Sequence, residues 1–339
     1  MRMVVLVMAV GISGHTVGQS DDSVSAPREL ITRSKALVTQ DSFGAALRAA
    51  DEAMRQATPK SQEEAEAHLQ YARVLSELGL FDKALEHGLE AMRLTDAAER
   101  PVLYYEAWNS VGLAHYRMAH MEDARRSFEG VLNELGESGD ARTRSFALNN
   151  LGMLEHATGH PQVALGCYQR SLALKISLQD TVAIVHTLNN IGTVYAGEAQ
   201  PDSALHYYRR SLCLKDLLVD KPGRASTLGN IGEVYGSMGM LDSAQWYLEG
   251  AKALADSLGV PETQVSIFHN LAELYKAKGD LPRALLMKEA FIAAREKLNN
   301  ERYARRVADL QVGYDLERKN TAIALLQQEA ESRSNRLRA

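Results

Sequence analysis

Histidine is the residue type in this chain that could bind a metal or transfer protons near neutral pH. Ten histidines occur, and they are scattered rather than grouped. His156 and His160 have the four-residue spacing that would place two ligands on one helix face. Gly159 and Pro161 interrupt a helix at that point, however. We therefore predict no metal site in the chain.

The sequence motifs of common catalytic and phosphate-binding sites are missing as well. There is no Gly-rich phosphate loop, no nucleophile elbow and no His-Glu-x-x-His pair. The Gly-Ser-Met-Gly segment at 236–239 is interpreted as a turn between helices. Carboxylates are frequent in the predicted helices, where we expect them to be solvated. We predict that the protein is not an enzyme and has neither catalytic residues nor a cofactor.

A more regular chemical pattern is formed by asparagines that recur every forty residues, at Asn150, Asn190, Asn230 and Asn270. A side-chain amide offers both a donor and an acceptor, which suits the backbone of an extended peptide. The alternative is structural, because such an amide can also bond the neighbouring repeat. The two roles are compatible.

The elements that position these asparagines are internal repeats, which we sought first because they decide the whole fold. Segments such as 147–155, 187–195, 227–235 and 267–275 align at a spacing of forty residues. The register extends to seven units, each with a small residue on a first helix and an alanine twelve residues later on a second helix. The small residues are Ser34, Ala72, Gly112, Gly152, Gly192, Gly232 and Ala272, and the alanines are Ala46, Ala84, Ala124, Ala164, Ala204, Ala244 and Ala284.

Glycine and proline mark the turn inside each unit. A glycine five residues before the alanine can take a positive φ and end the first helix. A proline is tolerated where the second helix begins. The glycines are Gly79, Gly159, Gly239 and Gly279, and the prolines are Pro161, Pro201 and Pro282.

These helix pairs resemble the tetratricopeptide repeat (TPR), over about residues 27–298. One unit matches its pattern with Trp108, Val111-Gly112, Ala124 and Phe128. Another matches with Ile191-Gly192, Tyr195, Ala204 and Tyr208. The forty-residue period is similar to the long-helix subclass in kinesin light chains and bacterial sensors. The resemblance implies an all-α, right-handed superhelical solenoid of about seven repeats, whose terminal units depart from the pattern because they cap the stack.

In such a solenoid the first helices line a concave groove, and the resemblance implies that this groove binds a protein or peptide. We expect Met153, Thr193, Glu233 and Glu273 to face it as well. The two glutamates would make its C-terminal half acidic, which would favour a basic or amide-rich ligand. The alternative is that these glutamates are ordinary solvated charges. The predicted groove residues are Asn149, Asn150, Asn189, Asn190, Thr193, Asn230, Glu233, His269, Asn270 and Glu273.

Composition narrows the classes of partner. The 339 residues are 45% hydrophobic and 24% charged, and the net charge is −5. No dense run of Lys or Arg is present, so nucleic acid is a poor candidate partner. Cys167 and Cys213 are six residues out of step in neighbouring repeats, which argues against a disulfide and predicts two free, packed thiols.

The first 18 residues have the layout of a secretory signal peptide, followed by a linker at 19–26. Met1-Arg2 precedes an apolar run from Met3 to Ile12, and small and polar residues follow it. The run is too short to span a bilayer. We therefore expect a mature chain that does not insert into the membrane and is extracytoplasmic, in the periplasm. If the signal peptide prediction is wrong, the protein is cytoplasmic.

The segment 299–339 is predicted to form a C-terminal helix. Tyr303, Val307, Leu310 and Tyr314 follow the spacing of a helical seam, after which the register slips. Two readings remain open, namely a short coiled coil that makes a homodimer and a helix packed on the last repeat. The segment has a Leu-x-x-x-Tyr step from Leu310 to Tyr314, a charged stretch and then Ile-Ala-Leu-Leu-Gln-Gln-Glu at 323–329. In these features it resembles the region after the repeats in bacterial membrane-bound TPR sensors.

The leading hypothesis is thus an exported TPR scaffold that binds a protein or peptide in its concave groove. One alternative is an extracytoplasmic sensor module whose kinase or regulator half is separate or missing. A second alternative is a cytoplasmic peptide-responsive regulator.

Overall fold

The computed structural model describes residues 26–40, 42–95, 101–259 and 261–338, and every regular element in these ranges is an α-helix. The signal peptide expected at 1–18 and nearly all of the linker at 19–26 lie outside them. The helices are α1 (Ala26–Thr39), α2 (Phe43–Gln56), α3 (Gln62–Glu77), α4 (Phe81–Thr95), α5 (Val102–Arg117), α6 (Met121–Leu135), α7 (Ala141–Ala157), α8 (Pro161–Ser177), α9 (Thr181–Gly197), α10 (Pro201–Leu218), α11 (Lys221–Ser237), α12 (Leu241–Leu258), α13 (Pro261–Ala277) and α14 (Leu281–Arg338).

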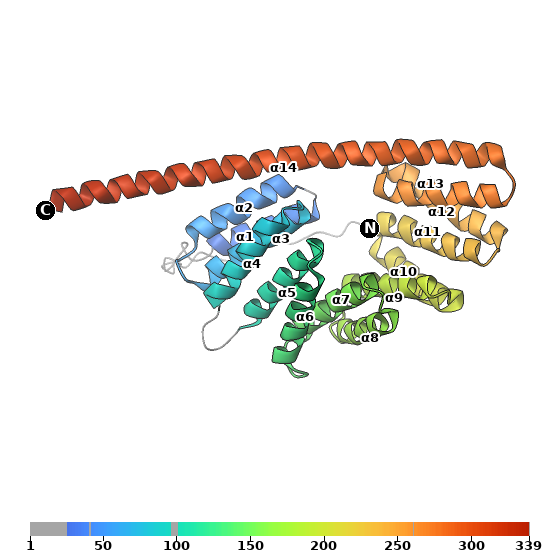
Figure 1. Ribbon diagram of the computed structural model, residues 1–339, viewed down its shortest axis with the longest axis horizontal. Helices are drawn as coiled ribbons and strands as arrows, with labels where there is room; N and C mark the ends of the chain where they lie inside the picture. Colours follow the sequence, from blue (N-terminus) through green and yellow to red (C-terminus); the bar gives the residue numbers. More distant parts are fainter. Residues whose placement is uncertain (1–25, 41, 96–100, 260, 339) are drawn as a thin grey trace, which may run out of the picture.

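The helices form seven antiparallel pairs that stack into a curved solenoid, as Figure 1 shows. Within the described ranges, the odd-numbered first helices of successive repeats contact one another, from α1·α3 to α11·α13. The even-numbered second helices of successive repeats do not. The first helices are therefore the more closely spaced set, and they lie on the concave side of the curve. The all-α solenoid predicted from the repeat is confirmed.

The glycine on each central first helix is required because a large side chain of the second helix lies on it. A Cβ at Gly152 would come within 2.9 Å of the Tyr168 ring, and one at Gly192 within 2.7 Å of the Tyr208 ring. These distances are shorter than a van der Waals contact, so only glycine fits at these crossings. The same relation joins Gly112 to Phe128 and Gly232 to Leu248.

The first two repeats, which lack this glycine, have a small residue on the second helix instead. Where the first helix carries Ser34 or Ala72, the position sixteen residues later is Ala50 or Gly88. The Ser34 hydroxyl also donates to the carbonyl of Ala46 at 2.8 Å, which ties the two helices of the first repeat. The departures at this end of the stack thus follow from packing, in addition to the capping expected of a terminal repeat.

The turns follow the predicted chemistry. Gly79, Gly159, Gly239 and Gly279 all have φ between 73° and 82°. Pro161 and Pro201 begin α8 and α10, where no intrahelical bond to their nitrogen is needed. Six of the seven repeat alanines are at most 2% exposed, and Ala284 packs partly buried against the last core cluster.

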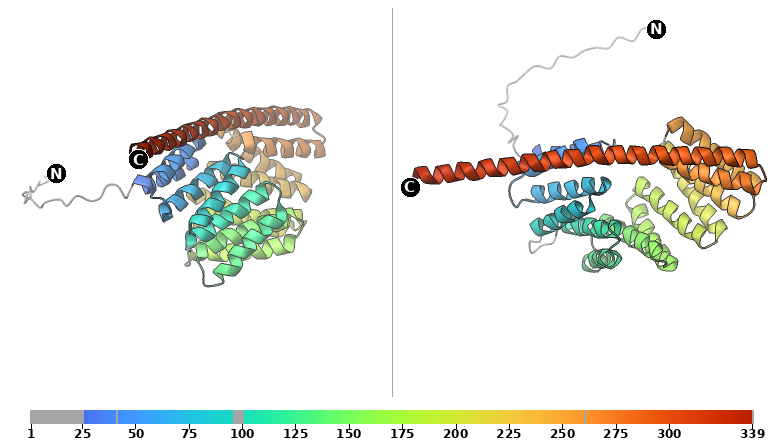
Figure 2. Two further views of the ribbon diagram at one scale, coloured as in Figure 1. Left: turned by 60° about the vertical axis from the view of Figure 1, so that its left-hand side comes forward. Right: turned by 45° about the horizontal axis from the view of Figure 1, so that its top comes forward.

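The last helix, α14, is continuous across the boundary expected at residue 299. Its first part pairs with α13, and it also contacts α2 of the first repeat. It therefore runs from one end of the curve to the other, as both views in Figure 2 show. Tyr303, Val307 and Tyr314 of the predicted seam are exposed.

Two sequence expectations about side chains and membranes can be assessed here. Cys167 is buried as expected, but Cys213 is exposed on α10, so the prediction of two packed thiols is wrong for Cys213. Both are free cysteines. Among the described helices, none combines the length and apolar character needed to cross a bilayer.

Candidate functional site

The candidate site is the row of polar side chains on the concave first helices α5, α7, α9, α11 and α13. The six predicted asparagines are half-buried, which leaves part of each amide accessible. Thr193, Glu233, His269 and Glu273 are exposed. All ten predicted residues lie on first helices, as the forty-residue repeat predicts.

Two of the asparagines bridge neighbouring repeats. Nδ2 of Asn150 donates to Oδ1 of Asn109 on α5 at 3.2 Å. Nδ2 of Asn230 donates to Oδ1 of Asn189 on α9 at 3.4 Å. Each bond joins residues forty-one positions apart, one repeat and one residue. The structural role of the asparagines is therefore real at these two steps.

The bridge is interrupted between α7 and α9, because other donors occupy Asn149. Its Oδ1 lies 3.3 Å from Nζ of Lys175 and 3.3 Å from Oγ1 of Thr187. Asn190, whose register partner would be Asn149, has no hydrogen-bond partner among the described residues. Among the six asparagines it is the one with neither its donor nor its acceptor bonded to a described residue, so both groups are open to a ligand.

Lys175 brings a desolvated positive charge next to this gap. Its side chain is 3% exposed, and Nζ donates to Thr187 Oγ1 at 2.7 Å and lies 5.7 Å from the centre of the Phe146 ring. Burial lowers the pKa of Lys175 to about 8, since the charged ammonium loses its water. Lys175 is thus mostly charged at neutral pH.

The arrangement recurs one repeat later, without the asparagine. Lys215 donates to Thr227 Oγ1 at 2.7 Å and to the carbonyl of Gly223 at 2.9 Å. Burial lowers the pKa of Lys215 as well. Each lysine thus places a buried basic group next to a threonine on the first helix of the following repeat, α9 or α11.

The acidic residues predicted at the C-terminal end do come together. Glu233, Asn270 and Glu273 line one cleft of about 320 Å³ between α11, α12 and α13. Nδ2 of Asn270 donates to Oε2 of Glu233 at 3.1 Å, so this amide supports the carboxylate. Glu273 is 3.8 Å from Nζ of Lys276, an exposed pair of little energetic weight.

The opposite end of the concave face has a different character. A cleft of about 280 Å³ across α1, α3 and α5 is lined by Lys35, Arg73, Glu66 and Glu106 among others. The guanidinium of Arg73 is 2.9 Å from Glu106, so part of this charge is compensated within the protein. At the position after each small anchor, the residues therefore change from basic through uncharged to acidic: Lys35, Arg73, Leu113, Met153, Thr193, Glu233 and Glu273.

Thr193 and His269 are less available than the asparagines. The Thr193 hydroxyl lies 3.1 Å from the Tyr208 hydroxyl and 3.1 Å from the carbonyl of Asn189. The His269 ring packs against Phe291 of α14 with centroids 5.5 Å apart. The predicted residues therefore do not make one contiguous site but a central gap at Asn190 and a separate acidic cleft.

A larger cleft, of about 950 Å³, lies elsewhere. It runs along α12 and the start of α11, and its lining includes Arg224, Leu228 and Trp246. Trp246 is 71% exposed. None of the predicted groove residues lines it. We favour the concave row because its polar groups are repeated and partly unsatisfied, whereas the larger cleft is an open apolar surface.

Sequence reasoning missed Asn109 and the two lysines. Asn109 precedes Asn149 by forty residues, but it is followed by Ser110 where the next repeat has a second asparagine, so the match is not evident. Lys175 and Lys215 share a forty-residue spacing, as do Thr187 and Thr227, so a signal was present. Their pairing across helices of different repeats could be read only from the structure.

No family model matches the sequence, and no curated protein matches it either. Solved structures with a similar fold do exist. The Rap conjugation gene regulator of the plasmid pLS20, in complex with the Phr* peptide, has a TM-score of 0.60 and 16% identity, with 85% of this chain and 80% of that chain covered.

Two further structures share the architecture. A Signal Transduction ATPase with Numerous Domains from Pyrococcus horikoshii, with a tetratricopeptide repeat sensor, has a TM-score of 0.64 and 15% identity, covering 81% of this chain and 43% of that one. Aspartyl phosphate phosphatase F from Bacillus subtilis has a TM-score of 0.61 and 10% identity, covering 81% and 71%. The chain therefore has the fold of TPR-type repeat proteins.

Proposed function

We propose that this chain is a non-enzymatic scaffold that binds an extended peptide, or an extended segment of a protein, on its concave face. The observation that carries the proposal is the side-chain amide of Asn190, which has no hydrogen-bond partner among the described residues. The equivalent asparagines of the adjacent repeats, Asn150 and Asn230, each bond another asparagine. A half-buried amide without a partner is costly unless water or a ligand satisfies it.

A peptide backbone is the chemistry that best completes this site. Each peptide unit carries one donor and one acceptor, which matches the two functions of the Asn190 amide. A structure of similar fold is described as being in complex with a peptide, which is consistent with this class of ligand.

The charges along the groove would give the ligand a preferred direction. Glu233 and Glu273 line the C-terminal cleft, whereas Lys35 and Arg73 line the N-terminal one. A basic segment of the ligand would be attracted to the C-terminal repeats, because opposite charges across a recognition surface favour one register. Solvation of the two glutamates weakens but does not abolish this preference.

The test is selection of peptides from a random displayed library against the protein, followed by affinity measurements on the selected peptides. Asn190→Ala should weaken binding at least tenfold, the loss expected when a hydrogen-bonding group is removed and its partner remains unsatisfied. Trp246→Ala, in the larger cleft, is the matched control and should leave affinity unchanged. The reverse result would place the ligand on α12 and reject the groove.

The absence of catalysis is part of this proposal and has its own test. A structure of the same fold carries the name of a phosphatase, so the fold does not exclude such chemistry. Hydrolysis of acetyl phosphate should stay at the uncatalysed rate in the presence of the protein. Hydrolysis that rises in proportion to protein concentration would contradict the scaffold assignment.

We place the mature protein in the periplasm, on the strength of the signal-like residues 1–18. Mass spectrometry of the mature N-terminus should show cleavage near Gly18, and an intact Met1 would instead favour a cytoplasmic peptide-responsive regulator.

A sensor module remains the other candidate, since one structure of similar fold includes a repeat sensor. The exposed Tyr303, Val307 and Tyr314 favour a homodimer through α14, which light scattering would detect.

A further inference from the structure

A cluster of metal-ligating side chains lies at the turn between α5 and α6, away from the asparagine row. His115, His120 and Asp123 each offer one ligand atom, and these three atoms all lie within 4.8 Å of one another. Imidazole nitrogens and a carboxylate oxygen are the ligands that zinc takes in three-ligand protein sites. The cluster is made by one short segment, so its formation does not depend on distant parts of the chain.

The backbone of the turn brings the three residues together. His115 is in the last turn of α5, His120 is the N-cap residue of α6, and Asp123 is in the first turn of α6. The amide of His120 donates to the carbonyl of His115 at 2.9 Å, and Ala119 takes a left-handed φ of 62° to close the turn. The five-residue separation of the histidines is thereby converted into proximity of their rings, whose centroids are 5.9 Å apart.

The His115 ring has a polar atom that the protein leaves unsatisfied. Its Nδ1 is buried and has no hydrogen-bond partner among the described residues. Such an atom costs free energy unless it is paired.

The next repeat provides an internal comparison. Forty residues on, the same three positions hold Glu155, His160 and Val163. There Nδ1 of His160 lies 3.0 Å from Oε2 of Glu155, so a contact between a histidine and a carboxylate replaces the histidine pair, and the third ligand is missing. The cluster is therefore particular to the turn between α5 and α6 and not a general feature of the repeat.

We infer that His115, His120 and Asp123 bind a divalent transition-metal ion of the zinc type, with water completing its coordination. In a tetrahedral site with bonds of about 2.0–2.2 Å, the ligand atoms are roughly 3.3–3.6 Å apart. The separations, all within 4.8 Å, require a closure of at most about 1.5 Å, which side-chain rotation can supply because His120 is exposed and Asp123 is half-exposed.

One protein cation competes for this site. The guanidinium of Arg126 pairs with Oδ1 of Asp123, and the Arg126 side chain is 77% exposed. Such an exposed pair contributes little to stability, so a metal ion can displace it or use the other carboxylate oxygen. Removing Arg126 should therefore strengthen metal binding, which a non-specific histidine effect would not explain.

The experiment titrates the full-length protein, stripped of metal with a chelator, with Zn²⁺ alone at pH 7.5, using a competing chromophoric chelator. One site should be detected, and His120→Ala and Asp123→Asn should each weaken it at least tenfold. His160→Ala, at the same position of the next repeat, should not change it, and Arg126→Ala should tighten it. Zn²⁺ should also raise the melting temperature of the parent protein but not that of His120→Ala.

Zn²⁺ affinity that is the same in His120→Ala, Asp123→Asn and the parent protein would overturn the assignment. An equal loss in His160→Ala would do so too, because it would show binding by exposed histidines in general. Both substituted ligands are exposed or half-exposed, so misfolding is not expected, and circular dichroism of each variant checks this.

Discussion

Nδ2 of Asn230 donates to Oδ1 of Asn189 at 3.4 Å, and thereby ties α11 to α9. Asn190, the residue next to that acceptor, has no such bond among the described residues. The structural and the ligand-binding roles that an asparagine row can have are thus divided between adjacent positions. This division makes the two roles separable by mutation.

Asn230→Ala should lower the free energy of unfolding by about 1 kcal/mol, because it removes one hydrogen bond and leaves the Asn189 oxygen without that donor. Asn190→Ala should change it by less than about 0.5 kcal/mol, since no intramolecular bond is lost. Urea unfolding followed by circular dichroism measures both. Equal losses would show that Asn190 is also structural, and would remove the main support for the groove.

Gly152→Ala should destabilise the protein by about 1–3 kcal/mol, because the new methyl group would sit 2.9 Å from the Tyr168 ring. Gly166→Ala is the matched control in the same repeat, since its Cβ would meet nothing within 4 Å and it lies on an exposed helix position. That substitution should stabilise by about 0.5–1 kcal/mol through helix propensity. Melting temperatures that move in the same direction for both variants would refute the packing argument.

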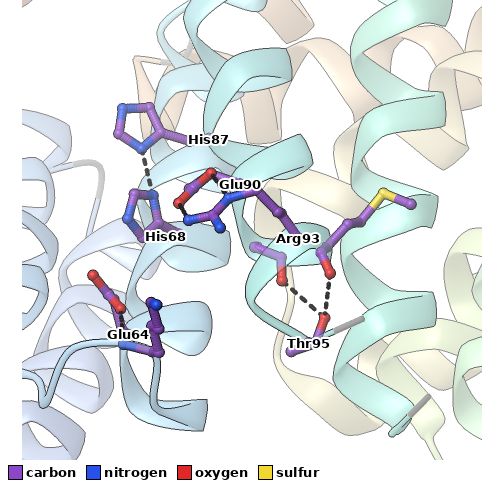
Figure 3. A network of polar contacts seen from close by, with 9 residues as sticks. Glu64, His68, His87, Glu90, Arg93 and Thr95 are labelled. Carbon is purple, nitrogen blue, oxygen red and sulfur yellow. Dashed lines mark hydrogen bonds and ion pairs between the residues drawn. The ribbon is translucent and has the colours of Figure 1, made fainter. Parts of the chain in front are cut away.

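A histidine pair in the second repeat predicts a loss of stability in acid. Figure 3 shows the rings of His68 and His87 facing each other, with their Nδ1 atoms 2.9 Å apart. Burial, and then the proximity of His68, lower the pKa of His87 to about 4. Burial also lowers the pKa of His68.

The sign follows from proton uptake. Between about pH 6.5 and 4 the unfolded chain binds protons that the folded pair excludes, so stability is complete above pH 6.5 and falls as the pH drops. We expect this pair to contribute roughly 1–3 kcal/mol of that fall. His87→Asn should reduce the difference in the free energy of unfolding between pH 7.5 and pH 4.5, whereas substitution of the exposed His156 by Asn should not. If the free energy of unfolding of His87→Asn falls with pH as steeply as that of the parent protein, other groups are responsible.

The helix positions of the asparagines in the concave row could be predicted from the sequence, but their hydrogen-bond partners could not. The repeat places Asn150, Asn190, Asn230 and Asn270 on equivalent positions, and the structure puts all of them on first helices. Their partners differ because the neighbouring side chains differ. Asn150 bonds Asn109, Asn230 bonds Asn189 and Asn270 bonds Glu233. At the remaining step Lys175 bonds Asn149, the residue that Asn190 would otherwise meet. A periodic sequence cannot reveal which of several nearby donors reaches an acceptor, since that depends on differences in position of less than about one ångström.

The repeat pattern was sufficient to predict the architecture, because each repeat carries its own turn, small crossing residue and alanine, and each packs only on its neighbours. Contacts between residues close in the sequence recur with the repeat and can be recognised from it. Features that do not recur were visible only in the folded structure. It showed that α14 reaches α2, that Asn149 is taken by a buried lysine while Asn190 stays open, and that a left-handed residue at Ala119 brings His115 and His120 together. These features depend on side-chain reach and on backbone conformation at single positions, and neither quantity is written in a repeat pattern.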